Sequence, residues 1–147
     1  IEMSKQLKFT EMQSLIHFDY LTNIYNRRYL EIQGDKWIQQ AKLENSDIVC
    51  AIIDIDNFKQ INDQYGHKFG DEAIKYFAQQ LNEAMEENMM CARLGGDEFV
   101  ILARYKENYE KLYLFHDVVL YVYSGKSSTA NATQSKRFRN KYRNTFQ

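Results

Sequence analysis

The opening of the chain alternates apolar and polar positions at a spacing that predicts helices. Within residues 2–17, which are mostly polar, apolar side chains recur at roughly helical intervals: Met3, Leu7, Met12, Leu15 and Ile16. This pattern predicts an amphipathic lead-in helix, and it is too short to decide whether the helix forms a coiled-coil linker. A second amphipathic helix is expected over about residues 27–43, with Asp19 or Thr22 as its N-cap.

The middle of the chain changes to patterns typical of strands. Residues 48–53 form a continuous apolar run of strand length, which is typical of a central strand covered on both faces. Residues 70–87 return to helical spacing, with one apolar stripe. Strands are then expected at about residues 90–94 and 98–104, and the glycines between them predict a β-hairpin.

The C-terminal third is less regular. Residues 106–116 have helical character, and the β-branched and aromatic content of residues 118–123 predicts a further strand. After Gly125 the chain is rich in Ser, Thr, Asn, Lys and Arg without any period, so this tail is expected to be disordered. The fold class is therefore α/β (α+β), with a central mixed sheet flanked by helices. The expected divisions are a linker helix at 1–18, one domain at 19–125 and a basic tail at 126–147.

Composition adds limits on partners and location. All 20 acidic residues lie before residue 126, whereas six of the 19 basic residues lie within residues 126–147. This basic tail carries few aromatic residues and no known nucleic-acid motif, so no nucleic-acid partner is expected. No apolar run approaches the roughly 20 residues that span a bilayer, so no direct membrane insertion of this segment is expected. Cys50 and Cys91 lack CxxC spacing and are interpreted as buried thiols in a reducing cytoplasm.

Two acidic turns carry the candidate chemistry. Asp54 ends the apolar strand, and Asp97 follows Gly95 and Gly96 in the hairpin turn. Ligands commonly bind where strands of one sheet end. Two carboxylates with a few carbonyl groups suit Mg²⁺, and glycines allow a substrate to approach the backbone closely. Taken alone these are weak signals, because acidic turns are common.

The acidic turns belong to a series of motifs. In order, these are Asp19-Tyr20-Leu21-Thr22, Asn26-Arg27-Arg28, Asp54-Ile55-Asp56-Asn57-Phe58-Lys59, Ile61-Asn62-Asp63, Gly66-His67-x-x-Gly70-Asp71 and Ala92-Arg93-Leu94-Gly95-Gly96-Asp97-Glu98-Phe99. Over about residues 19–104 their order and spacing resemble the GGDEF family of diguanylate cyclases. The resemblance implies a palm-like nucleotidyl-cyclase fold. It also implies a reaction in which two GTP, one on each domain of a homodimer, become cyclic di-GMP and two pyrophosphates.

The resemblance also implies roles for individual residues. The implied metal ligands, for Mg²⁺ or alternatively Mn²⁺, are Asp54, the Ile55 carbonyl, Asp97 and Glu98. Asp97 and Glu98 are the implied catalytic residues, and Glu98 would help to deprotonate the attacking hydroxyl. The implied GTP contacts are Asn62 and Asp71 at the guanine, Asn57 and Phe58 through backbone N–H groups, and Lys59 at the phosphates.

Each residue also has a plainer interpretation. Lys59 alone would be a solvated charge and Asn62 a turn residue. Asp56 is expected to be the N-cap of a turn over residues 57–63. Asp19 and Arg28 are candidates for an ion pair at the entry of the second helix.

The family pattern stops at about residue 105. The later Ser-Ile-Gly strand, the Ala-Asp-x-x-x-Tyr-x-Ala-Lys helix and Gly-x-Asn are missing, so a lysine contact to the triphosphate is missing too. The strand at 48–53 would then keep an open apolar edge, unless residues 118–123 replace the lost neighbour. The change to a basic tail resembles a truncated or frame-shifted ending.

Another departure lies before the Gly-Gly turn. The family's product-binding Arg-x-x-Asp is replaced here by Glu86 and Met89. The alternatives to an active cyclase are therefore an inactive GGDEF domain that binds GTP or partners as a regulatory or dimerisation module, and a poorly folding remnant. Because the chain begins with Ile1, an upstream sensor domain is also expected, and the segment could be the cytoplasmic part of a membrane-bound sensor.

Overall fold

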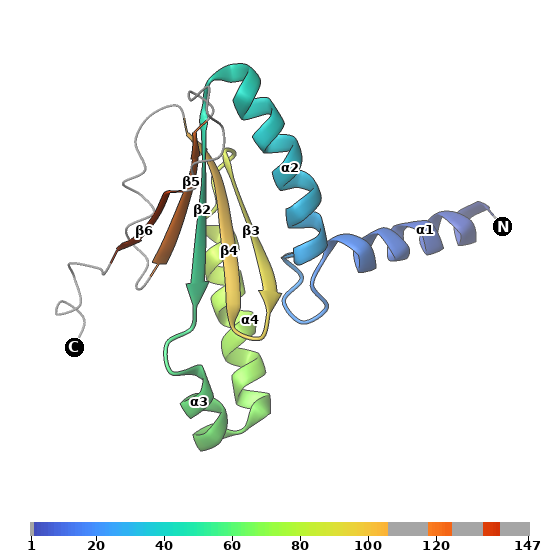
Figure 1. Ribbon diagram of the computed structural model, residues 1–147. Coiled ribbons are helices and arrows are strands. Elements are labelled where there is room, and N and C mark those ends of the chain that lie inside the picture. The colour runs from blue at the N-terminus through green and yellow to red at the C-terminus, as the bar shows by residue number, and fades with distance from the viewer. Residues whose placement is uncertain (1, 106–117, 125–133, 139–147) are drawn as a thin grey trace.

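The computed structural model describes residues 2–105, 118–124 and 134–138. Its helices are α1 (Glu2–His17), α2 (Arg27–Glu44), α3 (Phe58–Tyr65) and α4 (His67–Glu83). Its strands are β1 (Tyr25–Asn26), β2 (Asp47–Asp54), β3 (Met89–Gly95), β4 (Glu98–Tyr105), β5 (Val118–Ser124) and β6 (Gln134–Phe138), as Figure 1 shows. None of the helices in these ranges is long and apolar enough to cross a membrane. The helix expected over residues 106–116 lies outside the described residues.

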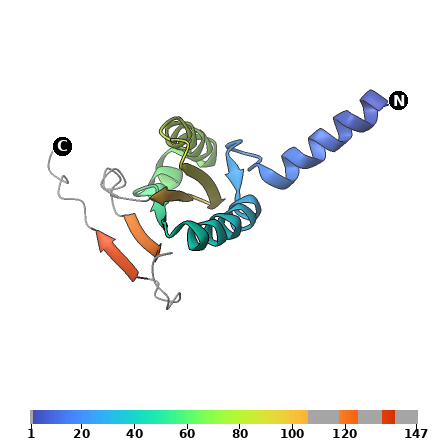
Figure 2. The same cartoon turned by 90° about the horizontal axis from the view of Figure 1, so that it is seen from above.

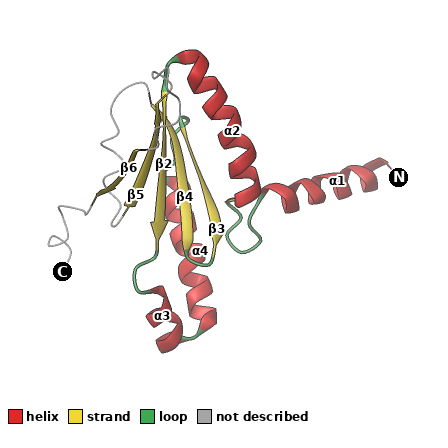
Figure 3. Ribbon diagram, in the orientation of Figure 1, coloured by secondary structure: helices red, strands yellow, loops and turns green. Residues whose placement is uncertain are grey.

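The strands form one mixed sheet in the order β1-β3-β4-β2-β5-β6. Strand β1 runs parallel to β3, and the other neighbouring pairs are antiparallel. Helices α2 and α4 lie on opposite faces of this sheet, as the views in Figures 2 and 3 agree. The expected mixed sheet flanked by helices is therefore confirmed.

The buried residues divide into two clusters, one on each face of the sheet. Ile74, Ala78 and Leu81 of α4 pack with Val49 and Ile53 of β2. On the other face, Leu30, Trp37 and Ala41 of α2 pack with Ile48 of β2 and Met90 of β3. Successive β2 side chains point to opposite faces, so a strand covered on both sides must be apolar at nearly every position. This explains the continuous apolar run.

Strand β2 has a neighbour along both edges. It pairs with β4 from Asp47↔Tyr105 to Asp54↔Glu98. On its other edge it pairs with β5 from Asp47↔Ser124 to Ile52↔Val119. The predicted strand over residues 118–123 is therefore confirmed, and the open apolar edge considered from the sequence is absent because β5 satisfies the β2 backbone.

Part of the C-terminal tail is also a strand. Residues Gln134–Phe138 form β6, which pairs with β5 from Val118↔Phe138 to Val122↔Gln134. This segment lies within the tail that we expected to be disordered. Its strand conformation differs from that expectation because the outer edge of β5 offers it unpaired backbone groups. The rest of that tail, residues 126–133 and 139–147, lies outside the described residues.

Helix α1 is present and projects away from the rest of the molecule (Figure 2), but its apolar residues do not gather on one face, so the expected amphipathic character was wrong. Several of its apolar side chains are exposed, among them Met3 at 78% and Leu15 at 76%. Its C-terminal end is held by a hydrogen bond of 2.8 Å from Asn26 Nδ2 to the Ile16 carbonyl. The linker helix therefore meets the body of the molecule at one end only.

The N-cap of α2 is Asn26, and the expected cap at Asp19 or Thr22 was wrong. The Asn26 Oδ1 accepts a hydrogen bond from the Tyr29 N–H at 2.9 Å. Residues 25–26 pair with β3 as strand β1, and the helix begins at Arg27, as expected. Asp19 is left for a different contact, described below.

Candidate active site

The candidate metal ligands gather where β2 ends and β3 turns into β4. Asp54, the last residue of β2, lies opposite Glu98, the first residue of β4. The Ile55 N–H lies 3.4 Å from the Asp97 carbonyl oxygen, in a long hydrogen bond that joins the two segments. Sheet pairing thus brings together four of the residues singled out from the sequence, and Figure 1 shows both segments at the same end of the sheet.

The turn between β3 and β4 requires its glycines for backbone reasons. Gly95 has φ of 148° and Gly96 has φ of 54°, both in regions that favour glycine. The sheet register shifts by a bulge between Arg93 and Gly95. A Cβ built on either glycine would meet no atom within 4 Å. The turn therefore faces open space, which leaves its backbone accessible to a ligand.

Negative charges crowd this end of the sheet. Burial raises the pKa of Asp54 above its ordinary value, and the charges of Asp97 and Glu98 raise it further. Asp56 adds a smaller repulsion of the same sign. Mutual repulsion of this kind is relieved by a bound cation. The carboxylates therefore suit a divalent ion.

The donor set is smaller than that of an all-protein metal cage. Within residues 2–105, 118–124 and 134–138, no group of three or more His, Cys, Asp and Glu side chains is arranged to hold a metal ion. Magnesium commonly takes one or two carboxylates and completes its shell with water and substrate phosphates. Asp54 and Asp97, with the Ile55 carbonyl and Glu98 beside them, match that smaller requirement.

The segment after β2 is a full helix rather than the expected turn over residues 57–63. Helix α3 begins at Phe58, and its N-cap is Asn57, whose φ is 58°. The expected N-cap role of Asp56 was therefore wrong. Asn57 makes no side-chain capping hydrogen bond, so the first N–H groups of α3 are not satisfied by the cap. These groups follow directly on the acidic end of β2.

The candidate guanine contacts lie on the hairpin formed by α3 and α4, which extends beyond the end of the sheet (Figure 1). Asn62 is partly buried in α3, whereas Asp71 in α4 and Lys59 in α3 are exposed. The helices are joined by Gly66, whose N–H donates to the Asn62 carbonyl at 2.8 Å. The hairpin therefore holds Asn62 and Asp71 in one unit, next to the carboxylates but separate from them.

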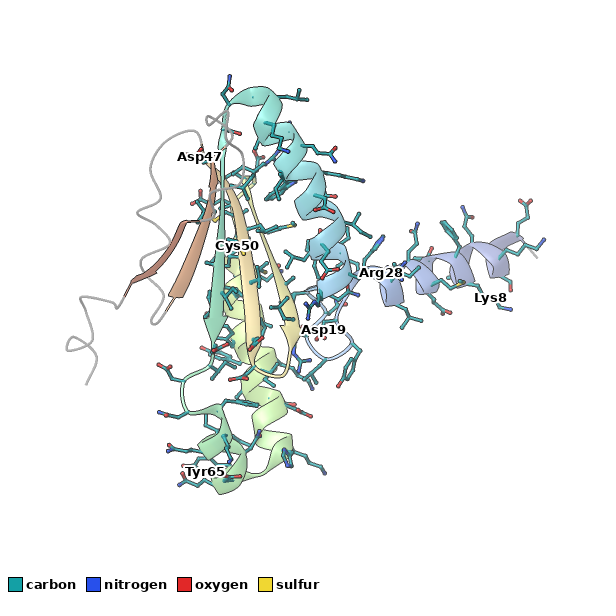
Figure 4. The ribbon with its side chains drawn as sticks, viewed as in Figure 1. Lys8, Asp19, Arg28, Asp47, Cys50 and Tyr65 are labelled. Atoms are coloured by element: carbon teal, nitrogen blue, oxygen red, sulfur yellow. The ribbon has the colours of Figure 1, made fainter. Side chains whose placement is uncertain are left out.

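Arg93 is a site residue that sequence reasoning missed. Its Nε donates to the Gly96 carbonyl at 3.0 Å, and its Nη1 lies 3.1 Å from Asp19 Oδ2. The anticipated pairing of Asp19 with Arg28 is therefore absent (both are labelled in Figure 4), because Asp19 pairs with the buried Arg93. An arginine inside an otherwise apolar strand was the signal that a buried partner exists.

Asp19 is also a hydrogen-bond acceptor for its own loop. Its Oδ2 accepts from the Thr22 N–H at 2.9 Å and from the Thr22 hydroxyl at 2.7 Å. Burial raises the pKa of this carboxyl, but the Thr22 hydrogen bonds and the Arg93 charge outweigh burial and hold the pKa below its ordinary value. One carboxylate thus organises the loop after α1 and, through Arg93, holds the Gly-Gly turn.

Known proteins share sequence features with this chain. The family model for the diguanylate cyclase GGDEF domain matches residues 16–116. Uncharacterized protein YhcK of Bacillus subtilis is 39% identical over 103 residues, which cover 69% of this chain and 28% of that protein. Diguanylate cyclase DgcS of Shewanella oneidensis is 33% identical over 98 residues, which cover 67% of this chain and 33% of that protein. The chain therefore spans a third or less of the length of these relatives.

A solved structure with the same fold is that of the coiled coil and GGDEF domain of DgcB from Caulobacter crescentus, in complex with c-di-GMP. It aligns with a TM-score of 0.69 and 28% identity, covering 77% of this chain and 59% of that one. Family model, relatives and fold agree with the acidic turn and the motif order. The chain belongs to the GGDEF domain family of diguanylate cyclases.

Proposed function

We propose that this chain is a diguanylate cyclase domain, which condenses two GTP into cyclic di-GMP and two pyrophosphates. The observation that carries the proposal is the pairing of Asp54 with Glu98, together with the Ile55 to Asp97 hydrogen bond of 3.4 Å. Phosphoryl transfer depends mainly on positioning and on neutralising phosphate charge. A site that concentrates carboxylates beside an uncapped helix start meets both requirements once a cation is bound.

Different residues would bind the metal ion, the phosphates and the guanine base. Asp54 and Asp97, with the Ile55 carbonyl and Glu98, would hold Mg²⁺ or alternatively Mn²⁺. Bound there, the ion would neutralise charge at the attacking and leaving oxygens. Glu98 accepts the proton of the attacking 3′-hydroxyl. In addition, the N–H groups of Asn57 and Phe58 bind phosphate oxygens, Lys59 adds positive charge there, and Asn62 with Asp71 reads the guanine.

The reaction needs two domains, each with one GTP. The 3′-oxygen of each GTP forms a bond to the α-phosphorus of the other, while the bond to the leaving pyrophosphate breaks. The active form is therefore a homodimer of this domain. Projecting helix α1 suits a connection to an upstream sensor domain, with the catalytic part in the cytoplasm.

An inactive GTP-binding module is the second candidate, and the C-terminal region favours it. The family match ends at residue 116, so β5 and β6 lie beyond it. The Ala-Asp-x-x-x-Tyr-x-Ala-Lys motif, whose lysine would reach the triphosphate, is missing from the chain. Such a module would bind GTP and act on a partner or on a second GGDEF domain without turnover.

Incubation of the purified chain with GTP and Mg²⁺, followed by chromatography, distinguishes these functions. Cyclic di-GMP formed by the parent and not by Glu98→Gln would support the cyclase. Binding of GTP that depends on Mg²⁺, without product, would support the regulatory module. Absence of both binding and product would refute both proposals.

A further inference from the structure

Two glycines of the α3–α4 hairpin are required for different physical reasons. Gly66 has φ of 86°, and a Cβ built on it would meet no atom within 4 Å, so its backbone conformation explains the glycine. Gly70 is the opposite case, because it lies within α4 and its N–H donates to the Gly66 carbonyl at 3.1 Å as in a regular helix. Its backbone is therefore one that alanine would adopt more readily than glycine.

What excludes a side chain at position 70 is the carboxamide of Asn62. A Cβ built on Gly70 would overlap Asn62 Oδ1 and would lie 2.9 Å from Asn62 Cγ. It would also come within 3.3 Å of Phe58 Cζ. The space that a side chain would fill is thus occupied by a residue of the candidate GTP site.

The Asn62 carboxamide is held there by packing rather than by a hydrogen bond. Its Oδ1 is buried and has no hydrogen-bond partner among the described residues. A buried acceptor without a partner costs free energy, so this position is not explained by stability. With Oδ1 turned toward α4, the amide NH₂ is the end left to donate to a ligand.

We propose that Gly70 is a positioning residue for guanine recognition. This inference rests on the proposed function. The missing side chain at Gly70 lets the Asn62 carboxamide lie against α4, so that its NH₂ group can donate to the O6 acceptor of guanine. Adenine carries a donor at the corresponding position, and an NH₂ group held there rejects it. Gly70 itself touches no substrate and acts through Asn62.

The test compares nucleotide affinities by calorimetry in Mg²⁺, using the non-cyclisable α,β-methylene analogues of GTP and ATP. Gly70→Ala is expected to weaken the GTP analogue about tenfold and to narrow its preference over the ATP analogue. Gly34→Ala is the matched control, because Gly34 is a helical glycine whose added Cβ would contact only Leu102 Cδ1, at 3.2 Å. This control should keep the parent preference.

A double-mutant cycle tests whether Gly70 acts through Asn62. In an Asn62→Ala background, Gly70→Ala should change the affinity for the GTP analogue by no more than about twofold. Equal losses in both backgrounds would overturn the inference, as would a Gly70→Ala variant with the full parent preference.

A nucleotide-free measurement separates this inference from the proposed function. In the parent, nuclear Overhauser contacts are expected between the side-chain amide of Asn62 and the α-protons of Gly70, and Gly70→Ala should shift the Asn62 amide resonances. Absence of these contacts would overturn the positioning role even if GTP binds normally. A parent that binds neither analogue would refute the proposed function, and with it the guanine role of Gly70.

Discussion

Arg93 and Asp19 are 74 residues apart in the chain and form an ion pair at 3.1 Å. Their side chains are only 9% and 13% exposed, so water screens the pair poorly. Because Arg93 also donates to the Gly96 carbonyl at 3.0 Å, one guanidinium connects the loop after α1 with the turn that presents Asp97. The relationship makes the loop and the turn one structural unit.

Removing Arg93 should therefore destabilise the protein strongly. Arg93→Met leaves Asp19 buried without its charge partner, and we expect the free energy of unfolding to fall by about 3 kcal/mol. The matched control is Arg27→Met, whose partner Glu31 lies 3.1 Å away in a pair with side chains 67% and 65% exposed. That variant should change stability by less than about 0.5 kcal/mol. Urea denaturation at neutral pH measures the stability of both variants. Equal losses would contradict the stabilising role of the Arg93–Asp19 pair.

The same pair predicts how stability depends on acid. The pKa of Asp19 is lowered in the folded protein, so its contribution is present above the unfolded pKa and is lost as pH falls through the folded value. The Arg93→Met variant lacks one of the interactions that lower the pKa of Asp19. Its stability should therefore fall less steeply than that of the parent on acidification, in melting curves collected below about pH 5.

Asp97→Asn should have opposite effects on the metal-free and metal-bound protein. Because the pKa of Asp54 is raised, Asp54 favours the fold at acid pH, and this contribution is lost as pH rises through the folded pKa. Removing the Asp97 charge reduces that loss, so the metal-free variant should melt higher than the parent at pH 7 and equally at acid pH. With Mg²⁺ and GTP the order should reverse, because the parent binds both more tightly.

The binding half of this prediction has its own control. Calorimetry should show weaker Mg²⁺·GTP binding and no turnover for Asp97→Asn, whereas Glu31→Gln, at an exposed position of α2, should resemble the parent. Equal GTP affinity of the parent with and without Mg²⁺ would show that the metal assignment is wrong.

Asp71→Ala should narrow the preference for GTP over ATP. A carboxylate can accept from both the N1–H and N2–H groups of guanine, which adenine does not offer. A polar group that the bound base covers and leaves unpaired disfavours the wrong base. Competition between labelled GTP and unlabelled ATP measures the preference. If the parent bound both nucleotides equally, the guanine assignment of Asn62 and Asp71 would fail.

We expect no tight cyclic di-GMP site around Glu86 and Met89. Glu86 lies between α4 and β3, and Met89 is the first residue of β3, whose N–H donates to the Glu86 carbonyl at 2.9 Å. A carboxylate at Glu86 repels the product's phosphates, and Met89 offers no acceptor oxygen to a guanine edge. Titration of cyclic di-GMP into nucleotide-free protein tests this. Micromolar binding that survives Asp71→Ala and is lost on changing Glu86 or Met89 would refute it.

Features set by local pattern were predictable, and those set by distant partners were not. The strand at 48–53 and the hairpin at Gly95-Gly96 follow from an apolar run and from turn chemistry. Helix α3 was missed although Phe58, Ile61 and Tyr65 have helical spacing. The helix has only eight residues, and a segment this short is easily interpreted as a turn. The motif order grouped Asp54 with Asp97, and the sheet register places Asp54 opposite Glu98, the residue that follows Asp97.

Long-range contacts explain the remaining differences. The Asp19–Arg93 pair joins segments 74 residues apart, and Arg28 looked an equally good local partner. The place of β5 beside β2 depends on competition among strand edges, which no local pattern encodes. The role of Gly70 became visible only once α3 and α4 were packed together.

Within the part of the chain that the structure describes, strand β2 pairs with β4 and β5, which are both synthesised after it. A ribosome adds about 5–20 residues per second, so the apolar strand leaves the exit tunnel seconds before a neighbour exists. Pairings between segments far apart in the chain also form slowly. During that interval two unpaired edges are exposed to other nascent chains. We therefore expect the yield of soluble protein to depend on chaperone supply and growth temperature more than the stability of the finished fold would suggest.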